Sequence, residues 1–247
     1  MKYQAVTLSL LSIMSTGSFA QEQESFEHIE VNYRQAYRGD VPVSEIPQAI
    51  TTLDRSLVDD INISRFRDVL LFSPSIALQN DGGNLWDSYS MRGFPGNENV
   101  PTGYLVNGFS SGRGFGGHRD VSNIEYVEVL KGPGSALYGR SDPGGVINVV
   151  TRKPQNAPEG YLKTSLGSDD RYRIEGDYTG GISDSVSARI NGAIQDDDSF
   201  RDHVSSKKKV VNPSLRWQLG KDTSILYAFE FMQQEQLFDR GIVVLDN

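Results

Sequence analysis

The stretch from Ile124 to Lys153 constrains the fold of this chain more than any other segment. It contains two runs rich in β-branched residues, around 127–130 and 146–150, which favours two half-buried strands. Glycines and prolines crowd the residues between these runs, so sharp turns and close backbone approach are expected there. Upstream the pattern mixes helices and strands, whereas downstream long alternating strands dominate. The stretch therefore marks a boundary between two architectures.

Upstream of that boundary, the sequence predicts a small domain of helices and strands. Residues 48–53 are strand-like, and Asp54 is placed to cap a short helix that runs to about Asp60. Ser64 is placed to cap a second helix, whose apolar residues repeat at helical spacing until Pro74 stops it. Two short helices are therefore expected directly after the first strand.

Further strands complete this upstream domain. The segments 89–94 and 103–109 are strand-like and bounded by Gly and Pro, while 135–138 favours a helical turn before a final strand. This order suits an α/β domain built on a mixed sheet. We expect its loops, rather than the Gly-rich stretch, to carry ligand contacts.

Downstream, from Gly160, the hydrophobic pattern changes to a period of two. The clearest run alternates apolar with charged residues: Tyr172, Ile174, Gly176 and Tyr178 against Arg171, Arg173, Glu175 and Asp177. Alternating segments of about ten residues are typical of transmembrane β-barrels, with one face to lipid and one to a wet interior. A soluble β-sandwich also alternates and is the competing interpretation. The aromatic-rich apolar faces and the strand lengths favour the barrel.

The connections between these predicted strands also alternate in length. Those at 181–185 and 220–223 are short, while 196–209 is long and charged, as expected for inner turns and outer loops. Pro213 falls inside a strand pattern, which we interpret as a bulge or a strand start.

The amino terminus has the pattern of an exported protein. Residues 1–20 combine Lys2, a short apolar run and the small residues of Ser18-Phe19-Ala20, which predicts a secretory signal peptide. Residues 21–40 are polar and predicted to be flexible. Within them, 26–31 alternates like a lone strand that could pair with the sheet edge of another protein; a disordered tail is the alternative.

Composition excludes several other classes of protein. The chain has no cysteine, which excludes a disulfide scaffold or a thiolate site, and its net charge of −8 argues against nucleic-acid binding. Residues 130–136 lack the spacing of a phosphate-binding loop, and Pro133 removes an amide that such a loop would use. His28, His118 and His203 lack ligand-like spacing. We therefore predict no catalytic group, no metal site and no enzyme.

The sequence VEVLKGPGSALYG followed by PGGVINVVTRKP resembles the end of the plug domain of TonB-dependent outer-membrane receptors, and GGVINVVTRKP resembles their ferric-siderophore branch. The resemblance implies an α/β plug domain followed by the first antiparallel strands of a transmembrane β-barrel. The implied organisation is a signal peptide (1–20), a flexible segment (21–40), the plug (41–154) and about five barrel strands (155–247). Because such barrels have roughly 22 strands, we expect an incomplete barrel and a fragment or truncated product.

The resemblance also implies a function. It would be active import of a ferric siderophore, a transported ligand with no covalently bound cofactor, through the outer membrane of a Gram-negative bacterium. The implied partners are the inner-membrane TonB complex, the siderophore and membrane lipid. Haem, cobalamin or a glycan is the alternative cargo. A soluble periplasmic binding module without transport is the alternative class.

Site residues follow from the same resemblance. The stretch similar to a TonB box is Glu27, His28, Ile29, Glu30 and Val31. Candidate ligand contacts in the plug loops are Asn84, Trp86, Asn97, Glu98, Arg113, Phe115 and His118. Their charged, amide and aromatic groups suit a large chelate. Arg92 and Lys131 are expected to meet carboxylates on barrel strands beyond this sequence. Two departures from the family pattern are Asn107, where Asp is commoner, and Lys131, where Arg is commoner.

Overall fold

A computed structural model describes most of the chain after the amino-terminal region. The described residues are 49–96, 103–113, 117–132, 134, 141–199 and 203–238. The predicted signal peptide, the flexible segment with its TonB-box-like stretch and the predicted helical turn at 135–138 lie outside these residues.

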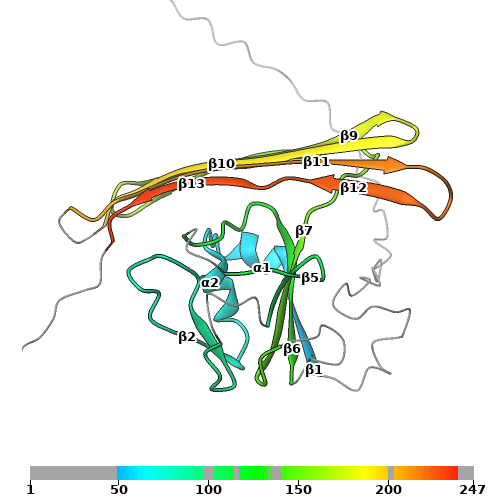
Figure 1. The fold of residues 1–247 in the computed structure, drawn as a ribbon. Coiled ribbons are helices and arrows are strands. Elements are labelled where there is room, and N and C mark those ends of the chain that lie inside the picture. Colours follow the sequence, from blue (N-terminus) through cyan, green and yellow to red (C-terminus); the bar gives the residue numbers. More distant parts are fainter. Residues whose placement is uncertain are drawn as a thin grey trace, which may run out of the picture. The chain divides into compact units, whose positions relative to one another are not determined.

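The first part of the described chain is the predicted α/β domain, called the plug domain below. Its elements are β1 (Ala49–Asp54), α1 (Arg55–Asp60), α2 (Phe66–Leu70), β2 (Ile76–Leu78), β3 (Tyr89–Met91), β4 (Tyr104–Val106), β5 (Phe109–Ser110), β6 (Ile124–Lys131) and β7 (Gly145–Thr151). The main sheet has the order β1-β6-β7-β4-β5, and β2 pairs with β3 (Figure 1). Only the β4–β7 pairing is parallel among these described strands, so the sheet is mixed, as predicted.

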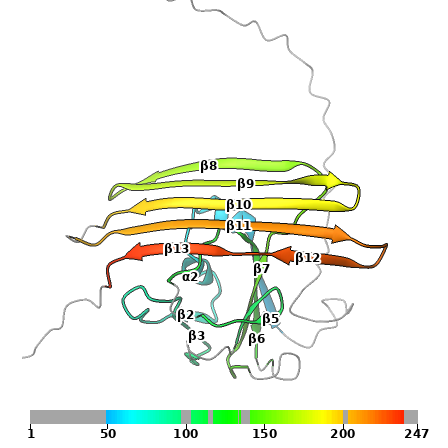
Figure 2. The same cartoon turned by 45° about the horizontal axis from the view of Figure 1, so that its top comes forward.

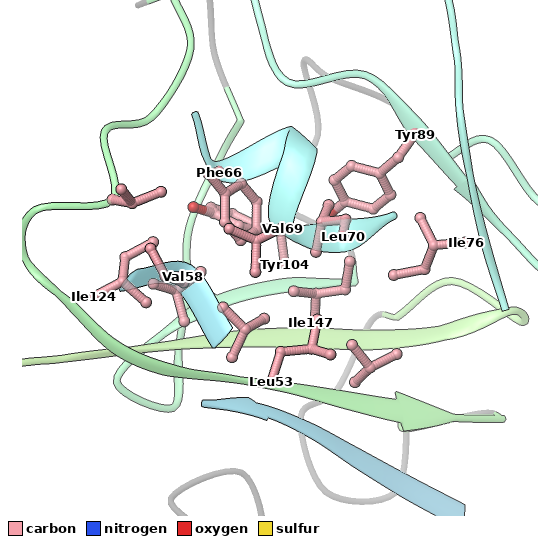
Figure 3. Close-up of a cluster of buried hydrophobic side chains, with 14 of the residues drawn as sticks. Leu53, Val58, Phe66, Val69, Leu70, Ile76, Tyr89, Tyr104, Ile124 and Ile147 are labelled. Atoms are coloured by element: carbon pink, nitrogen blue, oxygen red, sulfur yellow. The ribbon is translucent and has the colours of Figure 1, made fainter. Parts of the chain in front are cut away.

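The plug core lies between the two helices and the sheet. Phe66, Val69 and Leu70 of α2 are fully buried and pack with Ile147 of β7 in one apolar cluster (Figure 3). The helical spacing of these α2 residues is what brings them onto one face. Burial of such side chains stabilises a domain by about 1.5–3 kcal/mol each.

The Gly-rich stretch owes its shape to close backbone packing. A Cβ on Gly144 would lie 2.1 Å from the carbonyl oxygen of Met91. A Cβ on Gly145 would lie 2.2 Å from the carbonyl oxygen of Leu130, and its φ is +147°. Only glycine permits both approaches. These glycines therefore bring β7 against β6 and the end of β3, as the density of breakers predicted.

Polar side chains form a series of hydrogen bonds across the plug sheet, from the β4–β5 turn to β7 and β6. Asn107, in a left-handed turn with φ 52°, donates to Thr151 Oγ1 (2.8 Å) and accepts from the Thr151 amide (3.0 Å). The buried Asn148 accepts from the Gly108 amide (2.9 Å) and donates to Glu128 (2.8 Å). These bonds fix the β4–β5 turn onto β7.

The second part is a sheet of long strands, called the wall sheet below. Its strands are β8 (Glu159–Gly167), β9 (Arg171–Ser183), β10 (Val186–Asp197), β11 (Ser206–Gln218), β12 (Ser224–Ala228) and β13 (Phe231–Gln236). Figure 2 shows them side by side, with β12 and β13 end to end along β11. All pairings are antiparallel, and among the described residues the sheet is open at both edges. This confirms the predicted fold class.

The two faces of the wall sheet differ as the alternation predicts. On β9, Ile174 is 54% exposed, whereas its neighbours Arg173 and Glu175 are 5% and 4% exposed. The apolar face is therefore turned outward and the charged face inward. This inversion of ordinary soluble packing is typical of a strand with one face to lipid. In the described part of the chain, no helix is both long and apolar enough to span a membrane.

Pro213 lies in the interior of β11, so its interpretation as a bulge or strand start is wrong. Ser214 pairs with Ala228 in β12 and Val211 pairs with Phe231 in β13, so the register is continuous past the proline. The Phe229 amide donates to the Pro213 carbonyl (3.0 Å), but Pro213 has no N–H to return a bond. The neighbouring strand is therefore interrupted between β12 and β13.

Other local predictions were also wrong. Arg65, not Ser64, is the residue that precedes α2, and it makes no side-chain cap bond. The Ser64 hydroxyl instead accepts from Arg171 of β9 (2.5 Å). Asp54 precedes α1 as predicted but makes no cap bond. The expected 196–209 loop is shorter, because β10 continues to Asp197 and β11 starts at Ser206, where Lys207 pairs with Asp196 (3.0 Å).

Candidate functional site: plug loops and the plug–wall interface

The loop from Asn80 to Asp87 contains two of the predicted ligand contacts and is held by short-range bonds. Asp81 accepts from the amides of Gly83 (3.2 Å) and Asn84 (3.1 Å) and pairs with Arg67 of α2. These bonds are the turn chemistry expected of a D-G-G sequence. They fix Asn84 in a left-handed conformation with φ 68°.

His118 ties this loop to the next one. It is 1% exposed, with Nδ1 3.0 Å from Asp87 Oδ1 and Nε2 3.4 Å from Asn84 Oδ1. Its carbonyl oxygen accepts from Lys208 of β11 (3.1 Å). The imidazole predicted as a ligand contact is therefore buried between the two loops in this conformation, where it positions Asn84 and Asp87.

A polar cavity of about 400 Å³ lies beside this loop, at the ends of β10, β11 and β13. Asn84 contributes to its lining together with residues of the wall, and its carboxylates come from both parts: Asp81, Asp197 and Asp198. Gln236 of β13 donates to the Asn84 carbonyl oxygen. Trp86 does not line this cavity; its ring lies against Gly82, where a Cβ would come within 2.5 Å of it.

Arg113 lies at a second cavity, of about 230 Å³, between the plug and β11–β13. Its guanidinium stacks 4.3 Å above the ring of Tyr89 and donates to the Pro95 carbonyl oxygen (3.3 Å). Arg113 and Asn84, both predicted to contact the ligand, therefore lie at different cavities. The predicted contacts Asn97, Glu98 and Phe115 lie outside the described residues.

Arg92 and Lys131 lie at turns of the plug domain. Arg92 has a φ of 51° and its amide donates to the Ser75 carbonyl oxygen (2.8 Å). Lys131 ends β6 opposite Gly145. Within the described ranges neither side chain pairs with a wall carboxylate, and the barrel contacts expected for both residues stay predictions.

The strongest plug–wall contact was not predicted. Arg173 of β9 forms two hydrogen bonds to Asp120 of the plug, at 2.8 and 2.9 Å, and two to Glu175, at 2.5 and 3.2 Å. Glu175 also accepts from Arg55 of α1 (2.8 Å) and from the Tyr161 hydroxyl (2.6 Å). All four charged groups are largely buried, and bidentate Arg–carboxylate pairs are the strongest ion pairs in proteins.

A second group continues along β9 and β10. Asp177 accepts from Arg189 (2.8 Å) and Asn191 (3.2 Å), and Arg152 at the end of the plug lies 3.3 Å from it. Asn191 also donates to the Ser122 carbonyl oxygen of the plug (2.8 Å). A sequence signal existed for both groups. On β9, charged residues alternate with apolar residues. If the apolar residues face lipid, the charged ones face inward and need partners there, because unpaired buried charges are strongly destabilising.

The charge state of Asp120 follows from its surroundings. Burial by itself would raise the pKa of this carboxyl, but the hydrogen bonds and charge of Arg173 and the nearby Lys208 lower it to about 2. Asp120 is therefore ionised at neutral pH and holds its position as an anion between plug and wall.

The described residues contain no group of three or more His, Asp or Glu side chains arranged to hold a metal ion. The two cavities are lined by amide, guanidinium and carboxylate groups, which are chemically suited to contact a polar molecule.

Comparison with known proteins places this geometry in a family. The family profile of the TonB-dependent Receptor Plug Domain matches residues 42–146. The metal-pseudopaline receptor CntO of Pseudomonas aeruginosa is 40% identical over 214 residues, covering 86% of this chain and 30% of the relative. The ferrioxamine receptor of Yersinia enterocolitica is 31% identical, covering 77% and 27%. The chain thus spans about 30% of the length of these relatives.

Solved structures of receptors of this kind have a similar fold over most of this chain. FpvA of P. aeruginosa, in a complex with a heterologous pyoverdine and iron, has a TM-score of 0.73 at 29% identity, covering 81% of this chain and 27% of its own. The ferric-catecholate import receptor Fiu of Escherichia coli has a TM-score of 0.71 at 27% identity, covering 79% and 27%. The chain therefore contains a TonB-dependent receptor plug domain, followed by antiparallel strands that match those of TonB-dependent receptors.

Proposed function

We propose that this protein imports ferric siderophores across the outer membrane of a Gram-negative bacterium, with energy from the inner-membrane TonB complex. The observation that carries the proposal is the plug domain bonded through buried charges to the inward face of a wall sheet whose outward face is apolar. A soluble binding module is not expected to have such an apolar outer face, because a large exposed apolar surface promotes aggregation in water.

The cargo is proposed to be an iron chelate. Relatives named for ferrioxamine and ferripyoverdine support this assignment. The relative of 40% identity is named for metal-pseudopaline, which favours a second candidate cargo: a metal–pseudopaline complex. Uptake of ⁵⁵Fe by iron-limited cells, with a panel of hydroxamate, catecholate and mixed chelators, distinguishes the candidates. Cells lacking this gene that take up every chelate at the parental rate would rule out the iron proposal.

The TonB connection is proposed for residues 27–31. Deleting Glu27 to Val31 should abolish uptake while ligand binding to whole cells stays unchanged, because binding precedes energy input. Deletion of the same number of residues at Arg34 to Arg38 is the matched control and should leave uptake at or near the parental level. Normal uptake after the first deletion would remove the role assigned to that stretch.

The plug loops are proposed to contact the ligand. Asn84→Ala and Arg113→Ala should each weaken binding about tenfold, equivalent to loss of one good polar contact. Asn62→Ala is the control, because the Asn62 side chain accepts a hydrogen bond from Ser165 of the wall and lies in neither cavity lining. Unchanged affinity in both loop variants would move the ligand site away from the described loops.

A further inference from the structure

The plug is not bonded evenly to the wall. Towards β9 and β10 it is held by the bidentate Arg173–Asp120 pair, the Arg55–Glu175 pair and the Asn191–Ser122 bond. These groups are buried and share partners, so each keeps its neighbour's charge satisfied. Separating buried pairs leaves uncompensated charges, which makes this side resistant to opening.

Towards β12 and β13 the contacts are of another kind. Glu230, between the two strands, accepts from Arg119 at 2.6 Å and from Asn123 at 3.0 Å. Both plug residues, Glu230, Phe231 and Met232 line the 230 Å³ cavity. Among the described residues, this side also has the Gln236–Asn84 hydrogen bond but no second ion pair. The Arg119–Glu230 pair lies beside the cavity, where water can solvate both charges once they part.

The wall itself is weakest at the same place. Because Pro213 cannot donate, the ladder between β11 and its neighbour lacks a bond at Phe229, next to Glu230. Missing ladder bonds lower the local cost of opening. A cavity, a single ion pair and an interrupted ladder thus coincide.

We propose that the plug stays attached to β9 and β10 and separates from β12–β13 during import, so that the passage opens along the cavity at the Arg119–Glu230 pair. This rests on the proposed transport function. Arg119 and Asn123 on the plug and Glu230 on the wall then line the passage, and they present both signs of charge to a polar chelate.

Adjacent plug residues provide a matched test. Ser122 contacts β10 through Asn191, while Asn123 contacts Glu230. Because the chain contains no cysteine, two variants can be bridged cleanly by a short bifunctional thiol reagent: Ser122→Cys with Asn191→Cys, and Asn123→Cys with Glu230→Cys. Both are made in the protein expressed from its own gene. If the first pair does not assemble, Ser64→Cys with Arg171→Cys replaces it on β9.

Bridging 123 to 230 should reduce siderophore uptake at least tenfold relative to the unbridged variant, with ligand binding within twofold. Bridging 122 to 191 should leave uptake within twofold. Block by both bridges, by neither, or only by the 122–191 bridge would overturn the inference. Absence of uptake in the cysteine-free parent would instead contradict the transport function.

A measurement without a transported ligand tests the order of plug–wall separation independently of the transport function. In the purified protein, spin labels at 123 and 230 should separate at lower urea than labels at 122 and 191. Simultaneous separation, or the reverse order, would overturn the inference whatever the protein transports.

Discussion

The plug domain and the wall sheet bury opposite kinds of side chain. In the plug, Ile147 and Val149 are fully buried. In the wall, Ile190 is 55% exposed, whereas the preceding residue, Arg189, is 3% exposed. Both regions use β-branched strands. The difference lies in the surroundings: the plug must make its own apolar core, whereas the wall can turn apolar groups outward to lipid and satisfy charges against the plug.

Among the described residues, hydrogen bonds and ion pairs join the two regions, and neither buried apolar cluster includes a wall residue. Each inward-facing charged residue of β9 therefore needs one partner within the wall sheet and another in the plug.

Removing Arg173 should have the largest effect. Arg173→Leu leaves Asp120 and Glu175 buried without their main partner, which should lower the free energy of unfolding by about 3–5 kcal/mol. Denaturant unfolding in detergent micelles measures it. The double variant with Asp120→Leu should recover part of the loss. A change below about 1 kcal/mol in the single variant would mean that the pair does not join plug and wall.

Matched isoleucines separate core packing from lipid contact. Ile147→Ala should lower the free energy of unfolding by about 3–4 kcal/mol, because it loses transfer energy and leaves a cavity. Ile190→Ala should cost about 1–2 kcal/mol, because detergent or lipid fills the space and only the transfer part is lost. Equal losses at the two positions would contradict the inverted packing of the wall.

Acid should weaken the plug–wall interface through Asp120. Because its folded pKa of about 2 lies below the unfolded value near 3.8, its contribution is fully present above about pH 4 and is lost as pH falls towards 2. The loss amounts to about 2 kcal/mol. Unfolding measured from pH 5 to 2 should be less pH-dependent in Asp120→Asn than in the parent. Parallel profiles would show that Asp120 does not titrate with folding.

The turn at Asn107 should tolerate the residue commoner in the family. Asn107→Ala loses the two bonds to Thr151 at a positive φ and should cost about 1–2 kcal/mol. Asn107→Asp should cost less, because the Thr151 hydroxyl can rotate and donate to the carboxylate. A larger loss for Asp than for Ala would contradict this account of the turn.

An exposed wall pair should have the smallest effect. Lys207 and Asp196 are 62% and 48% exposed, so Lys207→Leu should change the free energy of unfolding by less than about 1 kcal/mol. A loss as large as that of Arg173→Leu would show that burial against the plug is not what makes the inward charges important.

The sequence predicted the order of elements and the alternation of the wall, because both depend on local spacing. It did not predict the Arg173–Asp120 pair, whose partners are 53 residues apart and meet only after strand register and plug docking are set. The prediction that Ser64 caps α2 was wrong, because its hydroxyl accepts a hydrogen bond from Arg171, which is distant in sequence. For Pro213, the pattern predicted an irregularity at the right place. Its structure, an interruption of the neighbouring strand, depends on which neighbour lies on the side where Pro213 lacks an N–H.

Spin labels on β9 test whether the apolar outer face of the wall sheet lies in lipid, opposite the face that the plug covers. Labels at Ile174→Cys and Tyr178→Cys, in lipid vesicles, should collide often with oxygen and rarely with a water-soluble nickel complex. A label at Asp184→Cys, in the turn after β9, should show the reverse. Nickel accessibility at 174 and 178 equal to that at 184 would contradict the account.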